Sequence, residues 1–228
     1  ELLKEVLSVP TKTYEEDMMI DFITSWLEEN NIPFYVDNFY NIYATKQTDE
    51  SIEYFPCVVA HTDTVHNIDT INVREEMLPN AQKEIKLALK AYNDEGNPTG
   101  IGGDDKCGVY SCLELLKELP NLKAAFFVAE ETGCKGSFNS DPRFFDNVGY
   151  AIQFDAPENN MISEFLMSKP MFNRDSEFFK VGGNLITEHF PGDTKYHRHP
   201  YTDIYPLNQK NGISCFNISA GYYNYHTR

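Results

Sequence analysis

The chain has 228 residues, with 35 Asp and Glu against 19 Lys and Arg, which gives a formal net charge of −16. This acidity argues against a nucleic-acid partner, and no apolar run approaches the roughly 20 residues that a membrane-spanning helix needs. The length and the 41% hydrophobic content suit one folded domain, residues 1–228. Five cysteines without CxxC spacing, and a start that does not resemble a signal peptide, favour a cytoplasmic protein with free thiols.

The N-terminal part is predicted to form two helices and then a pair of short strands. Residues 1–9 are amphipathic, and residues 14–30 repeat apolar side chains at helical spacing. Thr13 and Glu16 have the spacing of a capping box for the second helix. Residues 34–46 alternate around a central turn, which predicts two strands.

Three apolar, β-rich runs have no polar face, which is typical of strands buried on both sides of a sheet. They cover residues 57–60, 124–129 and 150–154. Acidic or imidazole side chains follow each run at once: His61 and Asp63 after the first, Glu130 and Glu131 after the second, and Asp155 after the third. Because ligand sites in open α/β sheets lie outside the carboxyl ends of the strands, this pattern predicts a site there.

The stretch Gly102–Gly108, which reads GGDDKCG, precedes a helical pattern over residues 109–119. Glycines give the backbone freedom, and the acids Asp104 and Asp105 then lie at the mouth of the helix. Taken alone, this is an acidic helix start that favours the helix dipole. Its place among the strand-end acids makes it a candidate for the same site.

The remaining segments are less regular. Residues 66–80 are polar and receive no predicted element. We expect a strand within 83–92, a helix within 175–190, a loop and short helix within 197–212, and a final strand within 213–228 that leads to His226.

Together these side chains form an imidazole–carboxylate set drawn from separate elements. Neutral imidazole and carboxylate oxygen are ordinary zinc ligands, and thiolates are not required. Five such ligands exceed the need of one tetrahedral ion, but they suit two ions that share one carboxylate. In a Glu-Glu pair, consecutive side chains point in different directions, so one can bind metal while the other moves protons.

The motifs HTD, GGDDKCG, AEETG, FDA and a final YHT, in this order, resemble those of the co-catalytic zinc exopeptidases. This clan includes bacterial leucyl aminopeptidases, peptidase T and glutamate carboxypeptidase. The resemblance implies that His61 and Asp155 bind one zinc ion. It implies that Glu131 and His226 bind the other, and that Asp104 bridges the two.

The same resemblance implies the remaining roles in the site. Glu130 would be the general base, and Asp63 would orient a metal-binding imidazole. The peptide bond between Asp104 and Asp105 would be cis. The implied fold is α/β, with a mixed, mostly parallel central sheet between helices and without a separate lid domain.

The resemblance therefore implies a di-zinc aminopeptidase that acts on peptides or small N-acyl amino acids, with manganese or cobalt as possible substitutes for zinc. In its lidless members, Thr202-Asp203 would match a Ser-Asp pair. Three alternatives stay open: a catalytically idle metal-binding scaffold, a single-zinc acyl- or cyclotransferase, and an N-acyl amino acid hydrolase. The sequence does not determine side-chain preference or oligomeric state.

Overall fold

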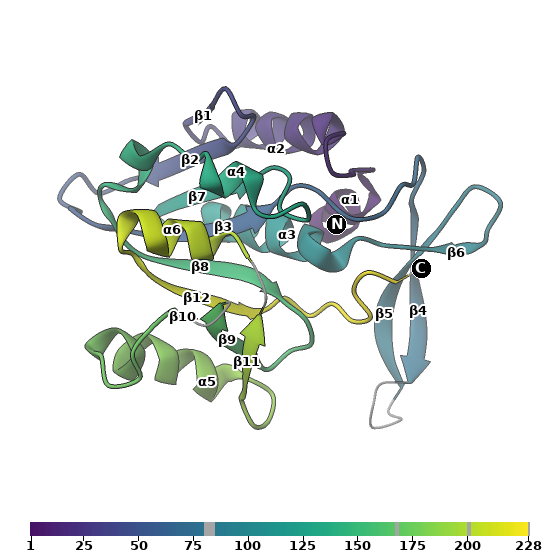
Figure 1. Ribbon diagram of the computed structural model, residues 1–228. Coiled ribbons are helices and arrows are strands. Elements are labelled where there is room, and N and C mark those ends of the chain that lie inside the picture. Colours follow the sequence, from purple (N-terminus) through teal and green to yellow (C-terminus); the bar gives the residue numbers. More distant parts are fainter. Residues whose placement is uncertain (80–84, 167–168, 200–201, 228) are drawn as a thin grey trace.

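The computed structural model describes residues 1–79, 85–166, 169–199 and 202–227. Its core is a nine-stranded sheet in the order β1-β2-β7-β3-β8-β12-β9-β10, with β11 beside β9 (Figure 1). The strands, in that order, are Phe34–Val36, Ile42–Gln47, Asn121–Phe127, Phe55–His61, Val148–Ala156, Ser214–Ser219, Met161–Leu166, Lys169–Pro170 and, for β11, Lys195–His199.

The centre of this sheet is parallel. Strands β7, β3, β8 and β12 run in the same direction, while at one edge β2 pairs antiparallel with β7 and β1 pairs antiparallel with β2. Consecutive residues of β3 enter different cores: Val59 packs on one side of the sheet, and Val58 and Ala60 pack on the other. The predicted mixed sheet is confirmed, and β3 and β7 are buried on both sides as predicted, whereas β8 is only partly so because Tyr150 is exposed.

Helices cover both faces of the sheet (Figure 1). On one face lie α1 (Leu2–Ser8), α2 (Asp17–Glu29) and α3 (Gly103–Glu118), around a core that includes Leu113. The other face carries a 3-10 turn (Pro142–Phe145), α4 (Lys135–Phe138), a π-helical turn (Phe179–Gly183), α5 (Asn184–His189) and α6 (Ile204–Asn211). Adjacent residues of β7 show the division, because Phe126 lies in the first core and Phe127 in the second.

A small second sheet contains a strand within residues 66–80, for which no element was predicted, and confirms the strand predicted within 83–92. It consists of β4 (Asn72–Pro79), β5 (Ile85–Tyr92) and β6 (Pro98–Thr99). Figure 1 shows β4 and β5 as a hairpin beside the main body. Among the described residues between Asp155 and His226, the strands all join the main sheet, so no separate lid domain interrupts this part of the chain.

The structure corrects the predicted capping box. Helix α2 begins at Asp17, and Glu16 makes no side-chain cap hydrogen bond. The Glu16 carboxylate instead accepts a hydrogen bond from the Ala129 N–H at 2.9 Å. The Thr13 hydroxyl donates to Asp63 at 2.8 Å. Both side chains serve long-range contacts that local spacing does not reveal.

Other boundaries also differ from the predictions. Helix α3 begins at Gly103, although Asp104 and Asp105 have non-helical backbone angles within it. The predicted helix over 175–190 is divided into the π-helical turn and α5. Residues 197–199, at the start of the predicted loop, belong to β11 and pair with β9. Residues 200–201 of that loop, and residues 83–84 of the strand predicted over 83–92, lie outside the described residues.

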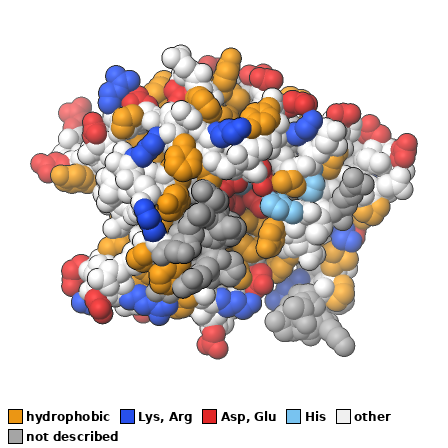
Figure 2. Space-filling view, in the orientation of Figure 1, with side chains coloured by type: hydrophobic (Ala, Val, Ile, Leu, Met, Phe, Trp, Pro, Cys, Tyr) orange, Lys and Arg blue, Asp and Glu red, His pale blue; other side chains and the backbone are white. Residues whose placement is uncertain are grey.

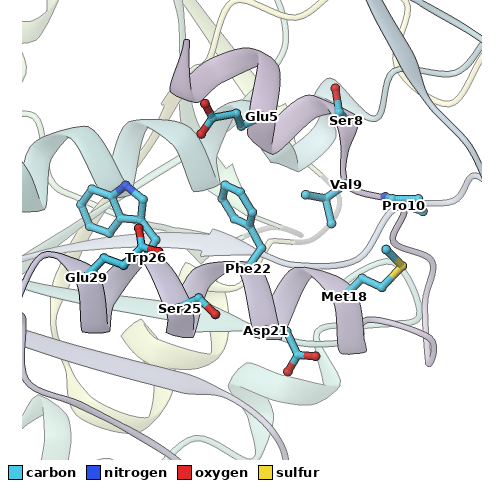
Figure 3. Close-up of a pocket in the computed structure, with 10 residues that line it drawn as sticks. All are labelled: Glu5, Ser8, Val9, Pro10, Met18, Asp21, Phe22, Ser25, Trp26 and Glu29. Carbon is cyan, nitrogen blue, oxygen red and sulfur yellow. The ribbon is translucent and has the colours of Figure 1, made fainter.

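No described helix is both long enough and apolar enough to cross a membrane. A surface groove of about 630 Å³ lies between α1 and α2, where Figure 3 shows Phe22 and Trp26 beside the acidic side chains of Glu5 and Glu29. None of its lining residues belongs to the predicted metal site.

Candidate metal centre

The carboxyl edge of the parallel strands brings the predicted ligands together. His61 is the last residue of β3, Asp155 lies near the end of β8, and Asp104 opens α3 beside them. Two groups of donors result, and within each group the ligand atoms all lie within 4.8 Å of one another. The groups are His61, Asp104 and Asp155, and Asp104, Glu131 and His226.

The first donor group is deeply buried. The His61 Nε2 lies 3.2 Å from Asp104 Oδ1 and 3.7 Å from Asp155 Oδ1. Its Nδ1 lies 3.0 Å from the backbone oxygen of Asp63. A proton on Nδ1 donated to that oxygen leaves the Nε2 lone pair directed at the two carboxylates, which is the tautomer that a metal-binding imidazole needs.

The second donor group is more open. The His226 Nε2 lies 3.1 Å from Glu131 Oε1 and 3.4 Å from Asp104 Oδ2, and this imidazole is about half exposed. Asp104 therefore presents one carboxylate oxygen to His61 and the other to His226. The donor types, their separation and the shared carboxylate fit a pair of divalent cations.

Asp63 holds the turn that carries the two glutamates. Its Oδ1 accepts the N–H of Glu130 at 2.9 Å, and its Oδ2 accepts the N–H of Glu131 at 3.3 Å. Its Oδ1 also lies 3.3 Å from His61 Nδ1, and the side chain is fully buried. The predicted orienting contact with His61 is thus present, together with a backbone role that the sequence did not reveal.

Asp105 belongs to neither donor group. Its two oxygens accept the backbone N–H groups of His61 at 3.1 Å and Gly108 at 3.0 Å, within a fully buried environment. The peptide bond between Asp104 and Asp105 is cis, as the resemblance led us to expect. Asp104 therefore faces the other donors, while Asp105 accepts hydrogen bonds from the backbone.

Crowded carboxylates perturb one another strongly at this edge. Burial and the neighbouring charge of Asp104 raise the pKa of Asp155 well above its ordinary value. Burial also raises the pKa of Glu130 and of Glu131. Hydrogen bonds, above all to Asp104, raise the pKa of His226 to about 9. Without cations these groups hold extra protons, and metal ions would displace those protons on binding.

Hydrogen bonds from the imidazoles have the opposite effect on the shared carboxylate. Burial alone would raise the pKa of Asp104, but the bonds from His226 and His61 outweigh it and hold the pKa far below the ordinary value. Burial would also lower the pKa of His61, yet its bonds to the surrounding aspartates raise that pKa well above normal. The geometry therefore keeps Asp104 ionised, as a bridging ligand must be.

Several supporting side chains were not identified from the sequence. The Tyr222 hydroxyl donates to Asp155 Oδ1 at 3.3 Å, and the Cys134 thiol donates to Glu130 Oε1 at 3.4 Å. The Gln153 amide lies 3.4 Å from Asp155 Oδ2, and its oxygen accepts the Thr202 hydroxyl. No local pattern marks Tyr222, Cys134 or Gln153, whereas family resemblance had drawn attention to Thr202.

Figure 2 shows acidic side chains gathered in a hollow of the surface, with histidine beside them and hydrophobic side chains around the rim. Asp203 is fully buried near this region. Its Oδ1 accepts the Ser137 hydroxyl at 2.6 Å, while its Oδ2 has no hydrogen-bond partner among the described residues. Burial raises the pKa of Asp203 to about 7.

Solved structures share the fold of this protein over almost the whole chain. A tripeptidase from Staphylococcus aureus subsp. aureus Mu50 superposes with a TM-score of 0.73 at 12% identity, over 99% of this chain and 90% of that one. An aminopeptidase from the archaeon Desulfurococcus kamchatkensis gives 0.64 at 15% identity, over 96% and 85%. This chain has the fold of these peptidases.

Coverage differs among the other similar structures. For the aminopeptidase PepT from Bacillus cereus ATCC 10987 the TM-score is 0.57 at 18% identity, over 71% of this chain but only 44% of that one. The chain thus spans less than half of the length of PepT. No family model matches the sequence, and no curated protein matches it either.

Proposed function

We propose that this protein is a metal-dependent exopeptidase, an aminopeptidase that removes N-terminal residues from peptides, with residues 1–228 as one catalytic domain. The observation that carries the proposal is the pair of donor groups that share Asp104 while Glu130 remains outside both. Glu130 nevertheless faces the site, because its Oε2 lies 3.9 Å from His61 Nε2. The fold shared with solved peptidases supports this reading.

In this proposal two zinc ions are held by the five donors that the sequence indicated, and manganese or cobalt would suit the same carboxylate-rich set. His61 and Asp155 would hold one ion, Glu131 and His226 would hold the other, and Asp104 would contribute to both. Such ions act as Lewis acids toward a carbonyl group and make a nearby water more acidic. Asp63 and Asp105 keep the ligand-bearing backbone in place.

Glu130 moves the proton in the proposed reaction. It takes a proton from the attacking water and delivers it to the amine that leaves when the C–N bond breaks, so the carboxylate is regenerated. Burial, which raises its pKa, suits a group that must both accept and donate a proton near neutral pH. The Cys134 thiol holds Oε1, which leaves Oε2 on the side of His61.

The acidic surroundings favour a substrate with a free, protonated α-amine. Net charge and the strand-end carboxylates make this edge of the sheet attractive to cations. An N-acyl amino acid has no such amine, so we place peptides with free N-termini first and N-acyl amino acids second. An idle scaffold would have no use for a buried, unligated Glu130.

Hydrolysis of short peptides and amino-acid amides, with added zinc, manganese or cobalt, tests the proposal. We expect turnover in the wild type and a loss of roughly 10²–10⁴-fold in kcat for Glu130→Gln. Glu53→Gln, at an exposed glutamate, is the matched control and should keep wild-type activity. Metal-loaded protein that hydrolyses nothing in a broad peptide panel would support the idle scaffold instead.

A further inference from the structure

A second hollow lies against the turn that carries Glu130. Its volume is about 310 Å³. Three of its lining side chains are exposed aromatic rings, those of Tyr14, Phe39 and Tyr40, with exposed fractions of 61%, 39% and 64%. The remaining lining residues are Glu16, Asp17, Ile20, Val128, Ala129 and Lys135. Neither donor group of the metal centre includes any of them.

Hydrogen bonds tie this hollow to the catalytic turn. Ala129, one of its walls, directly precedes Glu130, and the Lys135 N–H donates to the Ala129 oxygen at 3.1 Å. The Tyr14 hydroxyl lies 2.9 Å from Thr132 Oγ1, and the Lys135 ammonium bonds to the same hydroxyl. Two consecutive hydrogen bonds place the ammonium within about 6 Å of Thr132 Oγ1.

The ammonium of Lys135 suits the hollow to an anionic ligand. Lys135 is the one cation among the nine residues that line it, in a chain with a net charge of −16. The ammonium also lies 4.9 Å above the ring centre of Tyr14. An ammonium and a hydroxyl side by side form a site for a carboxylate, and the neighbouring aromatic faces suit an apolar side chain attached to it.

We propose that this hollow is the subsite for the C-terminal residue of a short peptide substrate, with Lys135 and Tyr14 binding the terminal carboxylate. The inference rests on the proposed peptidase function. Thr132, whose hydroxyl contacts Tyr14, directly follows Glu131 in the chain, so the hollow adjoins the turn that carries the proposed base and ligand. A carboxylate subsite beside this turn favours short peptides, whose C-terminus lies close to the bond that is cleaved.

Two carboxyl groups of the hollow oppose an anionic ligand. Glu16 is already engaged, because its oxygen accepts the Ala129 N–H at 2.9 Å, and burial raises its pKa to about 7. Asp17 opens helix α2 at the exposed rim and is the remaining countercharge. Removing that charge with Asp17→Asn should strengthen the preference for a free C-terminus.

Binding calorimetry on the metal-loaded Glu130→Gln variant tests the subsite without turnover. We expect Ala-Ala-Ala to bind roughly 10–100-fold more tightly than its C-terminal amide. Lys135→Met should bring this ratio close to one, Tyr14→Phe should lower it partly, and Asp17→Asn should raise it. Lys117→Met, at an exposed lysine on α3, is the control and should keep the ratio.

A second peptide separates the two possible sources of the carboxylate. If Ala-Ala-Glu-amide regains the full Lys135-dependent affinity of Ala-Ala-Ala, the site reads an acidic side chain and the C-terminal assignment is overturned. Equal binding of acid and amide, or a ratio that survives Lys135→Met, also overturns it. Absence of turnover in the wild type would instead count against the proposed peptidase function, and the calorimetric ratio would still decide the subsite.

Discussion

Replacing Asp63 with Asn tests whether this side chain organises the catalytic turn. The carboxylate accepts two backbone N–H groups, from Glu130 and Glu131, and the hydroxyl of Thr13, and it lies beside His61. Although burial raises the pKa of Asp63, its bonds from His61 and Thr13 outweigh that and lower it, so the folded state favours the charged form. An amide keeps the shape but presents an NH₂ donor where an acceptor is needed.

The magnitude follows from these contacts. One backbone donor loses its acceptor, and the charge-assisted bonds that remain are weakened. Breaking a buried charged arrangement of this kind costs about 3–5 kcal/mol of unfolding free energy. For a chain of this length, we expect Tm to fall by roughly 6–20 °C. Metal affinity should fall by about 10–100-fold, because the imidazole of His61 loses its orienting partner.

Urea unfolding in the presence of a chelator measures the first effect without a contribution from bound metal. Asp175→Asn, at an exposed aspartate whose side chain accepts none of the hydrogen bonds described for the site, is the control and should stay within about 0.5 kcal/mol of the wild type. A stability loss below about 1 kcal/mol in Asp63→Asn, together with unchanged metal affinity, would refute the organising role.

Two further predictions follow from the titrating groups. The pKa of Glu16 is about 7 in the fold, above its unfolded value, so its protonated form stabilises the fold and this stabilisation is lost as pH rises from about 4.5 to 7. In the wild type this decline in the free energy of unfolding should amount to about 1–3 kcal/mol, and Glu16→Gln should lack it when both are unfolded in urea. Identical pH profiles for the wild type and Glu16→Gln would contradict the prediction. Metal affinity should rise from pH 5 to pH 8, because the raised pKa values of Asp155, Glu131 and His226 mean that protons compete with the ions. Metal titrations at several pH values measure this, and a pH-independent affinity would show that these groups are not ligands.

The strand ends were predictable because two physical patterns coincide there. Buried parallel strands read as continuous apolar runs, and their carboxyl ends meet at one edge, so His61, Asp155 and the Glu130-Glu131 pair had to approach one another. The position of Asp104 beside them followed from family resemblance as much as from its helix start. The central sheet order itself came only from the structure.

The supporting contacts were not predictable, because they join residues far apart in the chain. Glu16 binds the backbone of Ala129, and Tyr222 binds Asp155, with no spacing pattern that links either pair. The capping box was a wrong interpretation for this reason, since a tertiary acceptor for Glu16 overrode its local preference. Ala129 also has a left-handed φ of 53°, which is incompatible with a strand, and β7 ends at Phe127 although the apolar run continues to Ala129.

Strand β4 was missed for a different reason, whereas its partner β5 lies within the strand predicted over residues 83–92. Strand β4 has no buried residue, so its sequence lacks the alternation that marks a strand with one face on a core. Its antiparallel partner β5 supplies backbone hydrogen bonds along the whole strand. Apolar patterns reveal strands that pack on a core, whereas β4 has no buried residue and pairs with β5 through its backbone.

The most direct test of the central claim is the number of metal ions bound per chain. Protein purified without chelator and supplied with zinc should contain close to two ions, and Asp104→Ala should lose most of both because this carboxylate faces both donor groups. Glu131→Ala should retain one, in the group of His61 and Asp155. A wild type that binds no ion, or an Asp104→Ala variant that keeps both, would contradict the shared two-ion centre.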